Sequence, residues 1–166
     1  MGNRLVVLIL AALLLAPVAA AAKPAVPSWR DSHPWSTEVA MVTVGTDELE
    51  AEIADTPPLQ GRGLGYRDGL EPGTAMLFVF EEATMPTFWM MGMRFCLDIV
   101  WIQGGTIVGA AESVCPMPNT SSADLPRYLP PIDVQYVLEV PAGWLASHGY
   151  SAGTPVEIKL PDPQGD

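Results

Sequence analysis

The chain has 166 residues, of which 8 are lysine or arginine and 19 are aspartate or glutamate, so its formal net charge is −11 at pH 7. This length suits one domain with a single hydrophobic core and leaves no room for a second. The acidity argues against nucleic acid and anionic lipid headgroups as partners, because such a surface repels both.

Residues 1–22 have the pattern of a secretory signal peptide. A short cationic start precedes an unbroken apolar run from Leu5 to Leu15, and Ala20-Ala21-Ala22 supplies the small residues for cleavage before Lys23. Cleavage would leave 7 basic and 19 acidic residues and a net charge of −12. The alternative is an uncleaved membrane anchor, for which this apolar run is short. We therefore predict an exported protein, periplasmic, otherwise extracytoplasmic or secreted, with no stable membrane span after cleavage.

The rest of the chain divides into a lead-in, one domain and a tail. Residues 23–36 are rich in proline and polar residues without periodicity, which predicts a flexible lead-in. Residues 37–161 carry the alternating apolar patterns of short strands and are predicted to form the domain. Residues 162–166 remain as a tail.

Within the domain, the alternation predicts strands separated by short turns and two helical segments. The predicted strands are 38–44, 48–54, 75–80, 87–91, 95–103, 106–114, 136–140 and 155–160. A helical turn or loop is predicted at 55–68 and a short helix at 141–149. We therefore predict a mainly β fold of the α+β type. Its compact antiparallel sheet of seven to eight strands would close into a small barrel or sandwich.

Residues 116–131 form a predicted long loop, because the five prolines in this stretch exclude regular structure. Long loops inside compact domains are often functional. The sequence leaves two interpretations open here, a functional loop and a passive connector.

The two cysteines, Cys96 and Cys115, predict one disulfide in an exported protein. A two-residue hairpin loop at Gly104-Gly105 would place Cys96 opposite Ser113. Cys115 would then lie two positions away on the same face, which is too far for a sulfur bridge. A wider loop or a β-bulge would bring the cysteines opposite each other, so we predict both the disulfide and an irregularity in this hairpin.

Several phrases of the domain, in this order, resemble the DUF192 family, a domain of unknown function. They are RGLGYRDGL (62–70), AMLFVF (75–80), FWMMGMRFCLDIVWI (88–102), GGTIV (104–108) and YVLEVPAGW (136–144). Phe-Trp-Met followed by Leu-Asp is the most specific part, and the resemblance covers about residues 38–160. It implies a small, compact, largely β fold and no established activity.

The sequence departs from this family at two positions. Met91 stands where similar sequences commonly have lysine or arginine, which weakens a catalytic role for a basic residue there. Cys96 stands where they commonly have proline, which fits an exported version that adds a disulfide.

Asp98 is the acid in the most apolar strand of the domain. Both faces of residues 95–103 are largely apolar, so the strand is predicted to be central and Asp98 at least partly buried. A buried carboxylate needs a cation or several hydrogen-bond donors. Available partners are Arg62, Arg67 and Arg94. We favour a structural ion pair between Asp98 and one of them, and the alternative is a pair at the edge of a ligand pocket.

The candidate site therefore comprises Arg62, Arg67, Trp89, Arg94 and Asp98, beside the proline-rich loop. The first functional hypothesis is a non-catalytic binding or interaction module. Its partner would be a small molecule, a glycan or an envelope protein.

The second hypothesis is a small hydrolase, for example on glycans, which would use Asp98 with Glu112 or Glu139 as paired carboxylates. Sequence spacing cannot supply the separation between carboxyl groups that this chemistry requires.

The sequence predicts no cofactor and no metal. His33 and His148 form no ligand spacing, and nucleotide-binding motifs are missing from the sequence. Met85, Met90, Met91 and Met93 suggest copper because thioethers are soft ligands. Strand alternation would separate Met90 from Met91 and Met93, so copper is not favoured. Phe88, Trp89, Met90 and Trp101 are assigned to the core, with an aromatic platform for a sugar or another apolar ligand as the alternative.

Overall fold

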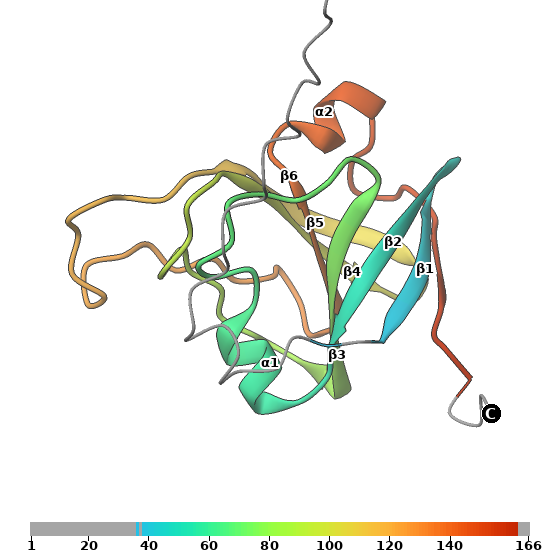
Figure 1. Cartoon of the computed structure of the whole chain (residues 1–166). Coiled ribbons are helices and arrows are strands. Elements are labelled where there is room, and N and C mark those ends of the chain that lie inside the picture. The colour runs from blue at the N-terminus through green and yellow to red at the C-terminus, as the bar shows by residue number, and fades with distance from the viewer. Residues whose placement is uncertain (1–35, 37, 163–166) are drawn as a thin grey trace, which may run out of the picture. The chain divides into compact units, whose positions relative to one another are not determined.

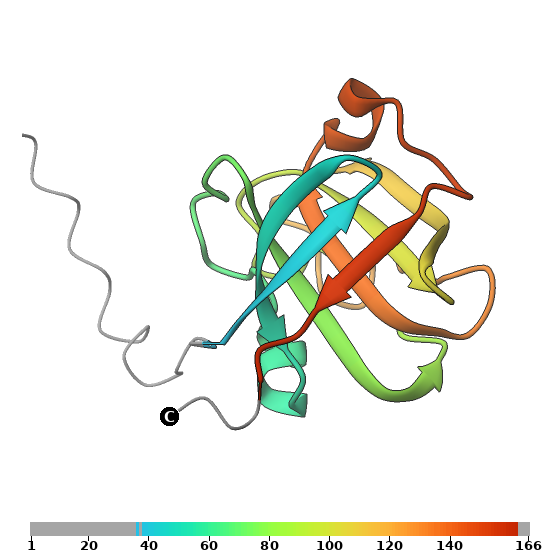
Figure 2. The same cartoon turned by 90° about the vertical axis from the view of Figure 1, so that its right-hand side faces the viewer.

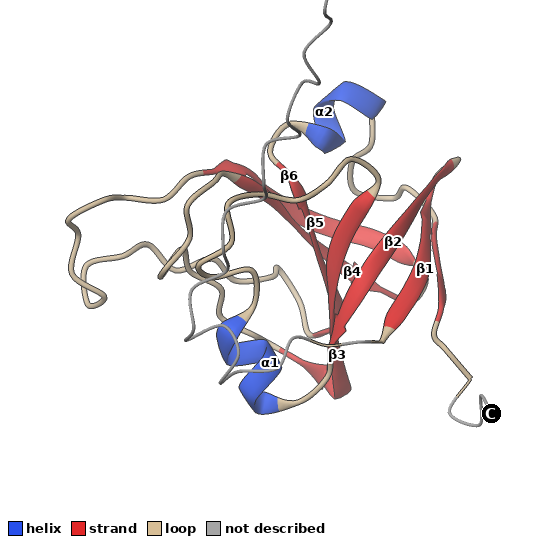
Figure 3. Ribbon diagram, in the orientation of Figure 1, coloured by secondary structure: helices blue, strands red, loops and turns tan. Residues whose placement is uncertain are grey.

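The computed structural model of the chain describes residue 36 and residues 38–162. The predicted signal peptide and nearly all of the predicted lead-in lie outside these residues. The described part forms one sheet of seven strands with two short helices (Figures 1 and 3). In chain order, the elements are β1 (Val39–Val44), β2 (Asp47–Ala54), α1 (Pro57–Arg62), β3 (Thr74–Thr84), β4 (Leu97–Gln103), β5 (Thr106–Val114), β6 (Val134–Pro141), α2 (Trp144–His148) and β7 (Val156–Lys159). Neither helix of the described part has the length and apolar character needed to cross a membrane.

The strand order across the sheet is β5-β4-β6-β3-β2-β1-β7. Every neighbouring pair is antiparallel except β2 and β3, which run parallel and are connected through α1. The sheet is therefore mainly antiparallel, with one parallel pair that the sequence pattern did not predict. The sheet is a curled half-barrel (Figure 2) whose edge strands β5 and β7 approach at the isolated bridge between Thr106 and Pro155. The predicted mainly β fold is thus confirmed. The predicted closure into a barrel or sandwich is not confirmed.

Apolar residues cover both faces of the central strands. The first face collects residues from all seven strands and from α2, including Val42, Leu77, Val100 and Leu138. The second face carries the alternate residues of the central strands β3, β4 and β6, including Phe78, Ile99, Trp101 and Val137, under the surrounding loops. Residues Leu97 to Ile102 of β4 are all buried. The prediction that this strand is central is therefore confirmed.

The predicted strand at 87–91 is wrong. In this segment only Phe88 has a ladder partner, in an isolated bridge to Tyr128 of the proline-rich loop. A turn follows immediately, closed by a hydrogen bond from Met93 N to Met90 O and with Gly92 at φ 72°. Phe88 and Met90 are buried in the cluster on the second face and Met91 is exposed, but the segment is not part of the sheet, so its apolar composition does not report a strand.

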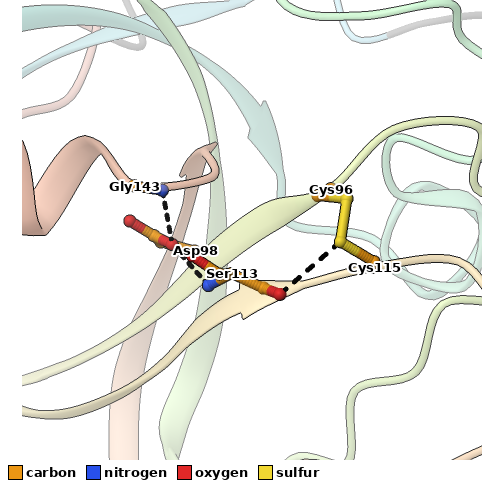
Figure 4. Close-up of a disulfide and its surroundings, with 5 residues drawn as sticks. All are labelled: Cys96, Asp98, Ser113, Cys115 and Gly143. Atoms are coloured by element: carbon orange, nitrogen blue, oxygen red, sulfur yellow. Dashed lines mark hydrogen bonds between the residues drawn. A yellow bond between two sulfur atoms is a disulfide. The ribbon is translucent and has the colours of Figure 1, made fainter.

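The β4–β5 hairpin has the predicted irregularity. Pairing starts in the expected register beside Gly104-Gly105, but two register shifts follow along the ladder. As a result, Leu97 faces Val114, two residues further along β5 than the loop alone would give. Cys96 and Cys115 therefore lie opposite each other with their Cα atoms 4.1 Å apart, and they form a disulfide (Figure 4).

Candidate functional site

A cavity of about 380 Å³, which we call the first cavity, opens on the second face of the sheet. It lies between α1, β3 and the segment 86–93. Its aromatic walls come from Phe78, Phe80, Phe88 and Trp89. Its lining also includes a cation, Arg62, and a carboxyl group, Glu139. A cavity of this size, with apolar walls and few polar groups, is typical of sites for small molecules.

Two prolines at its start and one side-chain hydrogen bond hold α1 beside this cavity. Pro57 and Pro58 occupy the first positions of the helix, where the missing N–H groups would have no helical partner. Gln60 Nε2 donates a hydrogen bond of 2.9 Å to the carbonyl oxygen of Val79 in β3. The helix is therefore fastened to the strand that supplies part of the cavity wall.

The proline-rich loop supports the opposite wall. The guanidinium of Arg127 lies over the ring of Trp89, 3.8 Å from its centroid. Phe88 and Tyr128 exchange backbone hydrogen bonds of 2.9 and 3.0 Å. Phe88 also meets Phe78 edge to face, with the ring centroids 4.9 Å apart. The loop at 116–131 thus holds the aromatic segment of the cavity and is more than a passive connector.

Glu139 is a buried acid in the middle of β6, with a fractional exposure of 6%. Its ladder neighbours are Met76 on β3 and Ile99 on β4, both apolar. Its Oε2 atom is buried and has no hydrogen-bond partner among the described residues. Burial raises the pKa of Glu139 from 4.5 to about 8, although the nearby Arg67 guanidinium acts to lower it. The carboxyl group is therefore mostly protonated at pH 7 and can donate a hydrogen bond as well as accept one.

Arg67 is engaged in a bidentate ion pair beside this site. Its two terminal nitrogens each lie 2.5 Å from a carboxylate oxygen of Glu52 on β2. The Arg67 side chain is largely buried, with 15% exposure. Two parallel charge-assisted hydrogen bonds hold the guanidinium rigidly. Arg67 thus supplies a fixed positive charge near Glu139 rather than a mobile one.

The raised pKa of Glu139 predicts a pH-dependent stability. The folded protein keeps the proton up to about pH 8, whereas the unfolded chain releases it near pH 4.5. The free energy of unfolding should therefore fall as the pH rises from about 4.5 to 8, because over this range the folded protein binds about one proton more than the unfolded chain. Glu139→Gln carries no such proton and should lack this fall. Urea unfolding at pH 5, 6, 7 and 8 measures it.

The matched control for this experiment is Glu112→Gln, because Glu112 is an exposed acid on β5. This variant should keep the pH dependence of the parent. Parallel profiles for the parent and Glu139→Gln would contradict the protonation state assigned to Glu139.

The structure separates the five residues of the predicted site. Arg62 and Trp89 both line the first cavity, and Arg67 lies close enough to act electrostatically on its carboxyl group. Arg94 instead reaches an exposed surface pair with Asp68, at 2.7 Å. Such pairs contribute little to stability. Asp98 lies on the other face of the sheet.

The carboxylate of Asp98 is bound by backbone N–H groups, so the predicted pairing with an arginine is wrong. Asp98 is fully buried, and its Oδ1 accepts hydrogen bonds from the N–H groups of Ser113, at 2.7 Å, and Gly143, at 3.0 Å (Figure 4). Its Oδ2 accepts one from the N–H of Leu145 at 3.1 Å. One side chain thus binds the irregular end of β5 and the first turn of α2. The structural interpretation of Asp98 fits these contacts.

The carboxylate pairs of the hydrolase hypothesis are not brought together. Asp98 points to the first face, as Val100 two residues further along β4 does. Glu139 points to the second face, as Val137 two residues earlier on β6 does. Their side chains therefore point to opposite sides of the sheet. Glu112 is exposed, while both oxygens of Asp98 are occupied in the interior. A glycosidase mechanism needs two carboxyl groups facing one substrate, and neither pair provides that.

Comparisons with known proteins agree with this fold. The family DUF192, described as an uncharacterized ACR, matches residues 40–158. The chain belongs to the DUF192 family. A comparison with curated proteins gave no match.

Two solved structures resemble this DUF192 protein. One, from Novosphingobium aromaticivorans DSM 12444, is a protein of unknown function with 28% identity and a TM-score of 0.66. The similarity covers 86% of this chain and 98% of that one. The other, from Sinorhizobium meliloti 1021, is described as a "putative transcription regulator", with 29% identity and a TM-score of 0.64. Here the similarity covers 75% of this chain and 95% of that one. Neither description names a ligand or a reaction.

Two features of the DUF192 site were missed by sequence analysis. Glu139 was considered only as a partner for Asp98, although an acid within the apolar run YVLEV is itself a signal of a buried polar group. Arg127 was not singled out, because one arginine in a long loop carries no pattern that points to Trp89. Met91, the departure from the basic residue common in similar sequences, lines the first cavity.

Proposed function

We propose that this DUF192 protein is a non-catalytic binding module that holds a small molecule in the first cavity. One observation supports this most directly. Glu139 lines a cavity of about 380 Å³, and its buried Oε2 atom has no hydrogen-bond partner within the part of the chain that the structure describes. Buried polar atoms are nearly always satisfied, so an unsatisfied one in a cavity wall indicates a missing partner.

The chemistry of the walls defines the ligand class. Aromatic rings favour a flat, apolar body, and the protonated carboxyl of Glu139 favours one carboxyl or amide group on it. The volume lies in the range of small-molecule sites, so we favour a small ligand over a glycan or an envelope protein. The net charge of −11 opposes nucleic acid, so we do not extend the regulator description of the Sinorhizobium protein to this chain.

Export is part of the proposal. The signal-peptide pattern of residues 1–22 and the disulfide between Cys96 and Cys115 support it, since disulfides persist in oxidising compartments. A binding module in such a compartment would meet its ligand outside the cytoplasm.

A thermal-shift screen of small aromatic acids and amides tests the binding proposal. Ligands of the folded protein raise its melting temperature by mass action, and a concentration of 100 times the Kd gives about 3 kcal/mol. We expect hits whose shift is strongly reduced in Glu139→Leu, whose side chain can neither donate nor accept a hydrogen bond, and retained in the exposed control Glu112→Leu. Their affinity should also weaken above about pH 8, where Glu139 loses its proton. Hits that shift both variants equally would place the ligand elsewhere.

A further inference from the structure

Four methionines line a second cavity, of about 260 Å³. Met90, Met91 and Met93 come from the segment after Trp89, and Met117 comes from the proline-rich loop. Met90 forms a buried part of the wall with 5% exposure, whereas Met91 and Met117 are 41% and 48% exposed. The cavity therefore brings together buried and exposed methionines from two distant parts of the chain.

A fixed turn gathers the first three methionines. Met93 N donates to Met90 O at 3.3 Å, and Gly92 has the positive φ of 72° that the third position of such a turn requires. Tyr66 N donates to Gly92 O at 2.7 Å, and a Cβ on Gly92 would lie 2.9 Å from the Tyr66 ring. These residues therefore do not alternate across a strand. The sequence-based reason for separating Met90 from Met91 and Met93 no longer applies.

The position of Met117 is restrained from the other side. It follows Cys115 by two residues, and the disulfide attaches Cys115 to Cys96 at the start of β4. Pro116 and Pro118 flank Met117 and restrict its backbone. Both segments that supply thioethers are thus held in place without a metal, which lowers the entropy cost of binding one.

We propose that the second cavity is a Cu(I) site formed by the thioethers of Met90, Met91, Met93 and Met117. Thioethers are soft, uncharged ligands that select Cu(I) over hard cations such as Mg²⁺ and Ca²⁺. Among the described residues, no group of three or more His, Cys, Asp or Glu side chains could hold a metal ion. Both cysteines are in the disulfide, so thiolates are not available, whereas thioethers remain ligands in an oxidising compartment.

Met91 and Met93 line both cavities, whereas Met90 and Met117 line only the second. Cu(I) binding by thioethers displaces no proton, unlike binding by cysteine or histidine. The affinity should therefore change by less than about twofold between pH 5 and 7.5, as the absence of a titrating ligand implies. This pH independence distinguishes a thioether site from adventitious binding at His148.

The test is an anaerobic titration of the full-length protein with Cu(I) against a chromophoric Cu(I) chelator. The parent should retain one equivalent, and the double variant Met93→Leu/Met117→Leu should lose at least about tenfold in affinity, since soft ligands set the selectivity. Leucine keeps the apolar volume, so the variant should fold. Met85→Leu is the matched control, because Met85 is 45% exposed and does not line the cavity. X-ray absorption of the Cu(I)-loaded parent should show sulfur neighbours only.

Four results would overturn the proposal. The parent could fail to retain Cu(I), or the double variant could bind as tightly as the parent while melting at the same temperature. The Met85→Leu control could lose as much affinity as the double variant. Nitrogen or oxygen neighbours in the absorption spectrum, together with an affinity that falls steeply with decreasing pH, would also place the ion elsewhere.

Discussion

Asp98→Ala is expected to lower the free energy of unfolding by about 3 kcal/mol or more. The substitution removes the acceptor of three backbone N–H groups, from Ser113, Gly143 and Leu145. Each buried donor left without a partner costs about 1–3 kcal/mol. Because Asp98 bridges β5 and α2, both elements lose an anchor at once. Urea unfolding at pH 7 measures the effect.

Asp98→Asn provides a graded comparison. An amide keeps one oxygen for the two donors at Oδ1, but its NH₂ group would face the N–H of Leu145, at the present Oδ2 position. This variant should lose about 1–3 kcal/mol, less than Asp98→Ala. Asp124→Asn is the surface control, since Asp124 is exposed in the proline-rich loop, and it should unfold like the parent. If Asp98→Ala matched the parent, the three hydrogen bonds would not anchor these elements.

Replacing both cysteines by serine is expected to cost about 3 kcal/mol of stability. The disulfide joins residues 19 positions apart, and a closed loop of about this length restricts the unfolded chain by that amount in the chain-entropy model. For a domain of this size, the melting temperature should fall by roughly 10 °C. Thermal unfolding of Cys96→Ser/Cys115→Ser beside the parent measures the effect.

A reductant separates the disulfide from the side-chain change. The parent treated with a reductant should melt close to the double variant, and the variant itself should not respond. A double variant that melts with the untreated parent would show that the β4–β5 hairpin holds its register without the covalent link.

The strands of this protein were predictable where a buried face alternates with an exposed one. β1 and β2 have this pattern, and the prediction placed both within a residue or two of their observed ends. The segment 87–91 is strongly apolar, but it pairs only through the isolated bridge between Phe88 and Tyr128, so its strand pattern was misleading. The parallel pairing of β2 with β3 was also missed, because a pattern within one strand carries no information about its partner.

In the candidate site, likewise, the sequence predicted which residues are buried better than which residues they contact. The burial of Asp98 was predictable from its apolar neighbours. Its hydrogen-bond partners were not predictable, because they are backbone N–H groups, which almost every residue has whatever its side chain. Arg62 and Trp89 were chosen for their chemistry, and both line the first cavity. The disulfide was predictable with its irregular hairpin, since the distance between two Cβ atoms constrains the register of both strands.

The pairing of β1 with β7 has a consequence for folding. Val42 of the first strand faces Ile158 of the last, so this edge of the sheet joins residues from nearly opposite ends of the domain. Contacts of such long range raise the contact order and slow folding, because a long loop must close before they form. Until β7 arrives, the edge of β1 exposes unpaired N–H and C=O groups that can pair with another chain. Aggregation of this protein during refolding should therefore depend on how fast its last strand docks.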